Sequence, residues 1–264
     1  MTERAMTEKM LLGNHAMAPE EIIPLLAQYN LIGQLLRETI IDEAIAGISC
    51  TPEEILNACE SVYRHFALSN EVEKNVWLSR YSLNHEQLQL LATRKLRIEK
   101  FKQVNWGNKI ESCFLQRKRN LDKVIYSLIQ TKNQNIAGEI FFRIKEGEQT
   151  WASLASQYSI GNEAQTGGLV GPIEFGNLAR NLAILLYTSQ SGVVQAPIPI
   201  GEYWVILRVE KFIAASLDNF MRQRLLNELF DSWLHEQCLQ LPDFEKAWMG
   251  ITQKVVPIKS NLVA

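Results

Sequence analysis

The chain has 264 residues, of which 47% are hydrophobic and 21% are charged, a balance typical of a soluble globular protein. This length suits one large domain or two ordinary ones. The formal net charge of −2 carries no overall signature of a nucleic-acid-binding protein. No apolar run reaches the roughly 18 residues that a membrane span needs.

Four cysteines are scattered through the chain without a CxxC pair or the spacing of metal ligands. We expect them to be reduced and largely buried, as small apolar residues are. The first residues mix charges of both signs and lack the apolar core of a secretory signal. These features together predict a cytoplasmic protein that holds neither a metal nor another cofactor.

Residues 18–120 show the apolar spacing of α-helices. Pro19 suits the first position of a helix. Thr51 and Glu54 form a capping box, in which each side chain satisfies a free backbone N–H group of the other. Asn84 is predicted to cap a long helix. The first part of the chain is therefore predicted to be an α-helical unit.

The pattern changes over residues 121–213. A short segment rich in β-branched and aromatic residues predicts a strand, and two helices, an extended segment and a further helix follow. Two last strands are expected near residues 193–194 and over 203–210, with Pro197 and Pro199 in the connection, where a central strand is disfavoured. The order β-α-α-β-α-β-β predicts a compact α+β domain.

Helical spacing returns over residues 214–240, where Ser216 is a candidate cap and the apolar residues form one broad stripe. Such a stripe has to be buried, and the helices of residues 18–120 are the simplest partner. We therefore predict one helical domain with the α+β domain inserted into it. Residues 1–17 are predicted to be a flexible tail and residues 241–264 a second tail.

The charge is unevenly spread. Residues 94–123 contain ten lysines and arginines and three acids. A basic stretch of this kind can meet an acidic partner, a nucleic acid or an anionic membrane surface. The favoured interpretation is that it is the solvated face of a helix beside an acidic neighbour.

A glycine cluster stands out between residues 158 and 173. Gly167 and Gly168 are adjacent, and Gly171 precedes Pro172. Glycine permits positive φ angles and close approach of another backbone, so the cluster predicts a bend. Loops of this type, held by helices and strands, commonly form binding sites.

Several segments of residues 121–212 resemble, at matching distances, the parvulin family of peptidyl-prolyl cis–trans isomerases. They read VIYSLIQT, KEGEQTWASLASQYS, TGGLVG, SQSGVVQAPIPIG and YWVILRVE. The resemblance implies a small α+β domain with an antiparallel sheet. The helices before it and the long helix after it are similar to those of chaperones of the SurA and PrsA type.

The resemblance also places the polar residues of the family site. Parvulins usually carry a histidine in the first strand, a cysteine or aspartate after the YS pair, and a histidine in the last strand. These positions fall on Tyr126, Gly161 and Trp204, and none of the four histidines lies in this domain. The Tyr126 hydroxyl and the Trp204 indole N–H are the candidate catalytic donors, although such aromatic residues also serve as ordinary core residues.

The apolar pocket of the family matches this sequence better than the polar residues do. Its positions fall on Val170, on Ile173 or its neighbour Pro172, on Leu178 and on Leu182. With Gly161, these are the candidate substrate-binding residues. The alternative is that the apolar residues simply form the core of the domain.

Two functions follow from the resemblance. The first is a divergent parvulin-type isomerase and chaperone that acts on X-Pro bonds of unfolded or precursor polypeptides. The second is a non-catalytic peptide-binding chaperone, or an accessory factor for secretion or maturation, whose parvulin domain has degenerated. Phosphate-loop, dinucleotide and Ser/His/Asp patterns are missing from the sequence.

Overall fold

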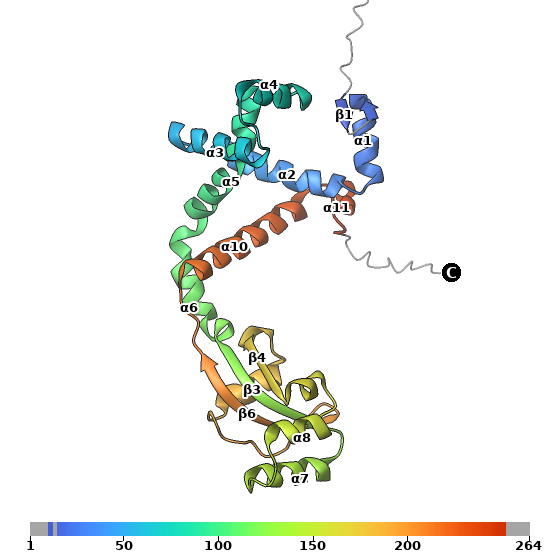
Figure 1. Ribbon diagram of the computed structural model, residues 1–264, viewed down its shortest axis with the longest axis vertical. Coiled ribbons are helices and arrows are strands. Elements are labelled where there is room, and N and C mark those ends of the chain that lie inside the picture. Colours follow the sequence, from blue (N-terminus) through green and yellow to red (C-terminus); the bar gives the residue numbers. More distant parts are fainter. Residues whose placement is uncertain (1–9, 13–14, 252–264) are drawn as a thin grey trace, which may run out of the picture. The chain divides into compact units, whose positions relative to one another are not determined.

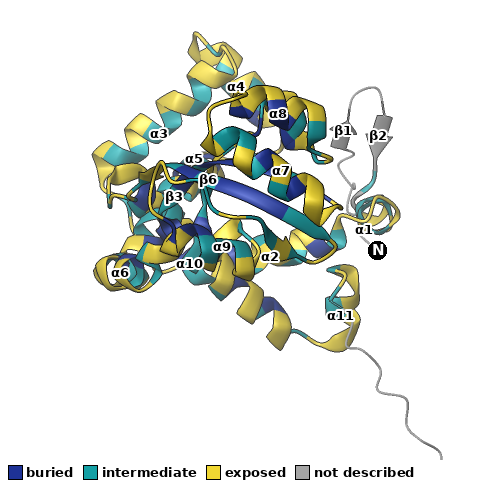
Figure 2. Ribbon diagram, turned by 90° about the horizontal axis from the view of Figure 1, so that it is seen from below, coloured by how far each residue is buried: buried dark blue, intermediate teal, exposed yellow. Residues whose placement is uncertain are grey.

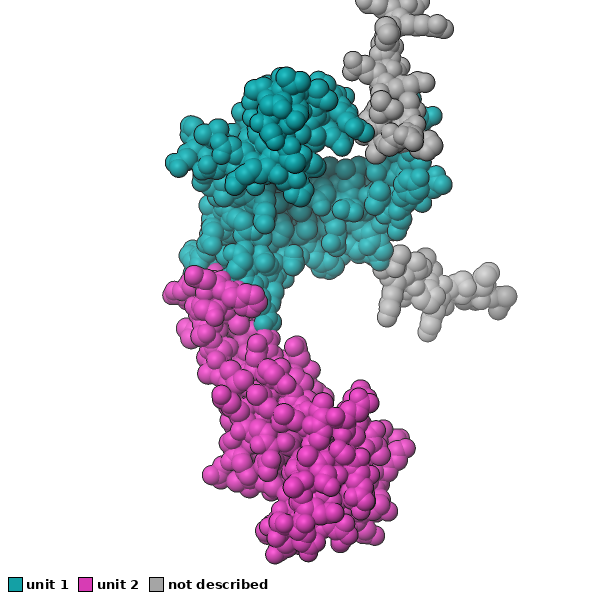
Figure 3. Space-filling view, viewed as in Figure 1, with its two compact units in different colours: residues 1–108, 223–264 teal, residues 109–222 magenta. Residues whose placement is uncertain are grey.

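The computed structural model describes residues 10–12 and 15–251 (Figure 1). The chain divides into two compact units, one of residues 109–222 and one that joins the residues up to 108 to those from 223 onward (Figure 3). The fold is α+β and mostly helical, with a four-stranded antiparallel sheet, as the sequence predicts. None of the helices in the described ranges combines the length and the apolar character that crossing a bilayer requires.

The unit of residues 109–222 is built on one antiparallel sheet with strand order β4-β3-β6-β5. Its strands are β3 (Lys123–Thr131), β4 (Leu169–Glu174), β5 (Ile198–Ile200) and β6 (Tyr203–Ile213). Its helices are α6 (Ile110–Leu121), α7 (Gln134–Lys145), α8 (Trp151–Tyr158) and α9 (Arg180–Thr188), with the short 3-10 helices η2 (Asn162–Thr166) and η3 (Phe175–Asn177). The two long strands, β3 and β6, form the centre of the sheet.

Side chains alternate between the two faces of a strand, so each face of this sheet has its own core. On one face, Ile129 and Ile206 pack against residues of α7 and α8, including Trp151. On the other face, Tyr126 and Leu207 pack with residues of β4, η3 and α9. We call the first the back face and the second the front face. The buried middle of β6 is dark blue in Figure 2, beside α7.

The edge of the sheet differs from the prediction. Residues 193–194 do not form a strand; Val194 makes an isolated bridge to Arg208, and the fourth strand is β5 instead. β5 contains Pro199, which is tolerated because β5 lies at the edge and pairs only with β6. Pro199 therefore rules out a strand in the centre of the sheet, but it permits a strand at the edge.

The other unit is helical among its residues from 18 to 108. Its helices are α1 (Pro19–Gln28), α2 (Ile32–Ile45), α3 (Pro52–His65), α4 (Glu71–Arg80) and α5 (His85–Trp106), and the 3-10 helix η1 (Gly107–Lys109) follows. The predicted capping box is confirmed: Glu54 N donates to Thr51 Oγ1 at 3.2 Å, and Thr51 N donates to Glu54 Oε2 at 2.7 Å. The Asn84 side chain accepts from Gln87 N at 2.8 Å, so it caps α5 as predicted.

The long helix after the sheet is α10 (Asn219–Gln240), and its core lies with the N-terminal helices. Phe230, Leu234 and Cys238 of α10 form a buried cluster with Ile41 and Ile45 of α2. The helix begins later than expected because Asp218, and not Ser216, caps it: Met221 N donates to Asp218 Oδ1 at 2.8 Å. The boundary between the units falls within α10, at residue 223, and α6 belongs to the sheet-containing unit.

Both predicted tails contain regular structure. Residues 1–9, 13–14 and 252–264 lie outside the described residues. Within the first tail, β1 (Met10–Leu12) and β2 (His15–Met17) pair as antiparallel strands. Each strand has three residues, which is too short for the alternation of apolar and polar residues that would predict a strand from the sequence. Within the second, α11 (Asp243–Trp248) packs on α2, where a Cβ atom at Gly33 would lie 2.4 Å from the carbonyl oxygen of Trp248.

The basic stretch of residues 94–123 is partly neutralised by ion pairs inside each unit. Arg94 binds Glu38 and Asp42 at 2.7 Å each. Lys100 binds Glu54 at 2.5 Å. Lys118 also pairs with Asp122, which follows the last residue of α6. All four cysteines are free thiols, of which Cys238 is buried and the others are half-buried.

Candidate functional site

The loop after α8 is tied to the end of β3. The Ser159 hydroxyl accepts a hydrogen bond from Gln130 N at 3.0 Å, and Ile160 N donates to Gln130 O at 3.1 Å. These bonds continue the edge of the sheet with a segment that is not a strand. They hold the residues that follow, Gly161 to Thr166, next to β3.

The glycine pair forms the predicted bend. Gly167 and Gly168 have φ angles of +62° and +87°, in the left-handed region that favours glycine. A Cβ atom at Gly168 would lie 2.5 Å from Trp151 Nε1 and 2.9 Å from Leu128 O. Leu128 N in turn donates to Gly168 O at 2.8 Å. The glycine is therefore required both by backbone conformation and by close contact with β3 and α8.

An acidic residue that the sequence analysis did not single out lies in this loop. Glu163 is only 9% exposed, although it belongs to the short helix η2. The Ser159 hydroxyl donates to one of its carboxylate oxygens, and Gln130 Nε2 donates to the other at 3.4 Å. Its burial depends on how the loop lies against β3, so nothing in the local sequence indicated it.

Tyr126 lies on the front face of the sheet. It is 4% exposed and packs in the cluster that contains Val205, Leu207 and Val209. Burial raises the pKa of Tyr126 above its ordinary value, and the negative charge of Glu163 raises this pKa further. The tyrosine hydroxyl therefore keeps its proton over a wider pH range than an exposed phenol does.

Tyr126 and Trp204 are not brought together. In the register of β3 and β6, Tyr126 is opposite Val209, whereas Trp204 is opposite Thr131. Trp204 packs against the back-face cluster, and its neighbour Val205 belongs to the front-face cluster with Tyr126. Because successive residues of a strand point to opposite faces, the two candidate donors cannot act on one substrate atom. Tyr126 and Trp204 therefore lie on opposite faces of the sheet, and a catalytic role for either residue stays a prediction.

The candidate apolar residues do gather near Tyr126. Val170, Leu178 and Leu182 are partly buried and pack against the front-face cluster. Ile173 pairs with Val124 in the ladder between β4 and β3. These residues thus form one wall of the front-face core, and their role in binding proline stays a prediction.

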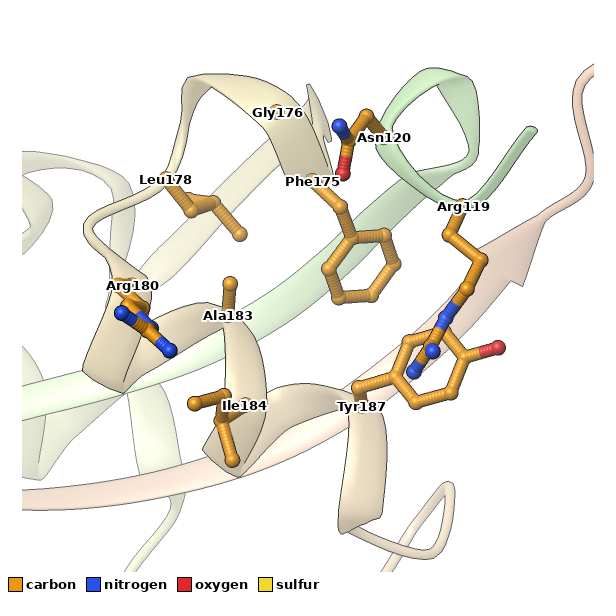
Figure 4. A pocket seen from close by; sticks show the side chains of 9 residues that line it. All are labelled: Arg119, Asn120, Phe175, Gly176, Leu178, Arg180, Ala183, Ile184 and Tyr187. Carbon is orange, nitrogen blue, oxygen red and sulfur yellow. The ribbon is translucent and has the colours of Figure 1, made fainter. Parts of the chain in front are cut away.

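A hollow of about 440 Å³ lies beside Leu178 (Figure 4). Its other lining residues come from α6, η3 and α9, and they are Arg119, Asn120, Phe175, Gly176, Arg180, Ala183, Ile184 and Tyr187. The Arg119 guanidinium lies 4.4 Å from the centre of the Tyr187 ring. Leu178 therefore borders both the front-face cluster and an open hollow.

No group of three or more His, Cys, Asp or Glu side chains within the described ranges is placed to hold a metal ion. Three polar side chains lie on the front face or in the loop beside it. Tyr126 offers a hydroxyl, Gln130 an amide and Glu163 a negative charge. Such groups can orient and polarise an amide but do not form a nucleophile–base pair.

Residues 126–211 match the family model Rotamase, the PPIC-type PPIase domain. The chain therefore carries a parvulin-type PPIase domain. The match begins at Tyr126 in β3 and ends at Lys211 in β6, so it includes all of β4 and β5 and most of β3 and β6. None of the curated proteins matches the chain.

Among solved structures, the chain is similar to the peptidylprolyl isomerase PrsA from Bacillus cereus, with 18% identity, coverage of 95% of this chain and 94% of that chain, and a TM-score of 0.41. The parvulin domain of PpiD from E. coli shows 24% identity, coverage of 37% and 95%, and a TM-score of 0.33. A SurA-like chaperone structure from Campylobacter jejuni shows 13% identity, coverage of 92% and 96%, and a TM-score of 0.36.

Proposed function

We propose that this protein is a divergent parvulin-type peptidyl-prolyl cis–trans isomerase and chaperone that acts on X-Pro bonds of unfolded or precursor polypeptides. The family match supports it at the level of the domain. The observation that carries it is the front face, where the apolar residues Val170, Leu178 and Leu182 pack in the same cluster as Tyr126. An apolar wall beside polar donors suits a proline ring and its peptide bond.

The reaction needs no nucleophile. Rotation about a peptide bond meets a barrier of about 18–20 kcal/mol but breaks no covalent bond. In the twisted transition state the prolyl nitrogen regains its lone pair and becomes a better hydrogen-bond acceptor. A site that prefers this state over the planar amide accelerates the reaction. The protonated Tyr126 hydroxyl is the candidate donor to that nitrogen.

A second candidate is peptide binding without catalysis, in a chaperone or accessory factor for secretion or maturation. The positions where parvulins usually carry histidine and cysteine or aspartate hold Tyr126, Gly161 and Trp204. Of these, Trp204 is turned to the back face. The loss of the usual polar groups favours retention of the pocket for binding alone.

An isomerase assay on Ala-X-Pro-Phe peptides, with X varied, separates the two candidates. The proposal predicts a rate above the uncatalysed one for at least one X. A background rate for every X, together with binding of an unfolded proline-containing peptide measured by calorimetry, would favour the second candidate. Failure in both measurements would contradict both.

We do not extend the proposal to an acidic partner or a nucleic acid at residues 94–123. Arg94 and Lys100 are already paired with acids of the same unit. Lys102 is buried and binds Glu99 and Asn227 at 2.8 Å each. These charges stabilise the helical unit in which they lie.

A further inference from the structure

The hollow beside Leu178 is lined by two positive charges and by no acid. Its lining residues all belong to the sheet-containing unit, and the charged ones are Arg119 of α6 and Arg180 of α9. In Figure 4 these two arginines lie toward opposite ends of the hollow, with Phe175 and Ala183 between them. Its volume of about 440 Å³ is within the range of ligand-binding pockets. We call it the two-arginine hollow.

The charge of Arg119 is not neutralised by a neighbouring acid. The Arg119 Cζ atom lies 4.4 Å from the centre of the Tyr187 ring, which holds the guanidinium at the edge of the hollow. The nearest acid in the sequence is Asp122, but its Oδ1 atom already accepts from Lys118 Nζ and from Ala215 N. Unlike the paired cations that precede it in the basic stretch, Arg119 forms no ion pair with any acid of the described residues.

Arg180 also lacks an acidic partner. It is exposed in the first turn of α9, which contains no acid. The N-terminal end of a helix carries a partial positive charge, so the helix itself does not balance a cation there. None of the ion pairs among the described residues includes Arg180. An anionic ligand in the hollow would therefore complement both arginines.

The two-arginine hollow adjoins a second hollow with a mainly apolar lining. This second hollow has about 250 Å³ and shares Phe175 and Tyr187 with the first; its other lining residues are Asp122, Phe212, Ile213 and Ala214. The Phe175 ring contacts Tyr187 edge-on at 5.5 Å and stacks on Phe212 at 6.2 Å between ring centres. Tyr187 and Phe212 nevertheless remain 45% and 42% exposed. Accessible aromatic rings beside arginines are typical of surfaces that bind proteins.

Leu178 connects the two-arginine hollow with the candidate proline site. It lines the hollow, and it also packs against the front-face cluster together with Val170 and Leu182. A polypeptide whose X-Pro bond lies at these front-face residues therefore has the hollow next to it.

We propose that the two-arginine hollow binds an acidic segment of the client polypeptide, in which an apolar residue lies next to aspartate or glutamate. The carboxylates pair with Arg119 and Arg180, because a guanidinium group binds a carboxylate through charge-assisted hydrogen bonds. The apolar side chain packs against the exposed rings of Tyr187 and Phe212. A free phosphate would satisfy the arginines but would leave these rings exposed, so a peptide fits the surface better. The inference rests on the proposed function and names the class of client.

The main test measures binding of proline-containing peptides by calorimetry. The peptides carry Glu-Leu-Glu, Gln-Leu-Gln or Lys-Leu-Lys next to Ala-Pro-Phe, on either side of it. We expect the wild type to bind the Glu peptide roughly fivefold to twentyfold tighter than the Gln peptide, with a factor of roughly two to five from each arginine. Arg119→Gln and Arg180→Gln should each remove one factor, and the double variant should lose the preference. The preference should also weaken as the ionic strength rises.

The matched control is Lys145→Gln in α7. Lys145 is an exposed cation of the same unit that also lies over an aromatic ring, that of Phe141, on the back face. Its loss should leave the preference for the Glu peptide unchanged. Arg180→Glu tests the charge in the opposite direction and should shift the preference toward the Lys peptide. Circular dichroism checks that each variant is folded.

The isomerase assay provides a second readout. The hollow lies beside the rotating bond and not on it, so it should bind the ground state and the transition state equally. The Glu peptide should therefore show a lower KM than the Gln peptide at a similar kcat, and the double variant should remove this difference in KM.

The outcomes separate the inference from the function on which it rests. Equal binding of the three peptides by the wild type, or a preference that survives in the double variant, would overturn the inference and leave the proposed function standing. Displacement of the Glu peptide by inorganic phosphate, at an ionic strength at which chloride does not displace it, would show a general anion site and overturn the assignment to a peptide. A wild type that binds none of the peptides and shows the background isomerase rate would overturn the proposed function, and the acidic client with it.

Discussion

The two faces of the four-stranded sheet differ in what their side chains can do. On the back face, Ile129, Ile206 and Trp204 pack with α7 and α8. Its polar groups include a carboxylate shared by two donors: Ser127 donates to Glu210, and Arg208 binds the same carboxylate at 2.7 Å. The buried Trp151 Nε1 on this face has no hydrogen-bond partner among the described residues. This face is closed and serves stability.

The front face combines an apolar cluster with a phenol and an amide side chain. Tyr126 lies there with Val170, Leu178 and Leu182. Gln130 is opposite Val205, a member of the same cluster, and donates to Glu163. One pair of strands thus presents a core on one side and a candidate site on the other. Substitutions on the two faces should therefore have different consequences.

The largest expected effect is on the back face. Ile206 is fully buried there, so Ile206→Ala should lower the free energy of unfolding by about 2–5 kcal/mol, through lost burial and the cavity left behind. Urea unfolding measures the change. Isomerase activity per folded molecule should be retained; its loss would show that the back face takes part in the site.

An intermediate effect is expected from a matched pair of Gly→Ala changes. At Gly161 the added Cβ meets Gln130 and Glu163, whereas at Gly138, in α7 on the back face, it meets nothing within 4 Å. Gly138→Ala should stabilise the protein by roughly 0.5–1 kcal/mol, as expected for a helical position. Gly161→Ala should displace the carboxylate and lower isomerase activity. Equal effects of the two changes on activity would remove the distinction between the faces.

The smallest effect concerns alkaline pH. Because the pKa of Tyr126 is raised in the folded protein, the unfolded chain loses this proton first as the pH rises above about 10. The stability that depends on the protonated phenol is fully present below that pH and is lost above it. The variant Tyr126→Phe should lose less stability between pH 9 and about 11. Thermal unfolding across this range measures the difference, and identical pH dependence would contradict a buried phenol on the front face.

Much of the fold could be predicted because its signals are local. The capping box of Thr51 and Glu54 and the cap at Asn84 depend on residues three positions apart, and both are present. The glycine pair likewise indicated the bend at Gly168. Features set by tertiary pairing were harder to predict, as the strand β5 at Pro199 shows.

The apolar candidates Val170, Leu178 and Leu182 pack against one buried cluster. This packing fits both a proline pocket and an ordinary core, so their binding role stays a prediction. The face on which Trp204 lies depends on a register that includes a bulge between Ile125 and Tyr126, and no sequence pattern reveals it. Glu163 was missed for a related reason, since its burial follows from the contact of the loop with β3.

The central claim is that the front face carries the site. The isomerase assay on wild type beside Tyr126→Phe and Trp204→Phe tests it most directly. The account predicts that Tyr126→Phe lowers kcat/KM by about tenfold or more, because a donor to the twisted amide is lost, and that Trp204→Phe stays near the wild-type rate. A lost rate in Trp204→Phe with a retained rate in Tyr126→Phe would contradict it.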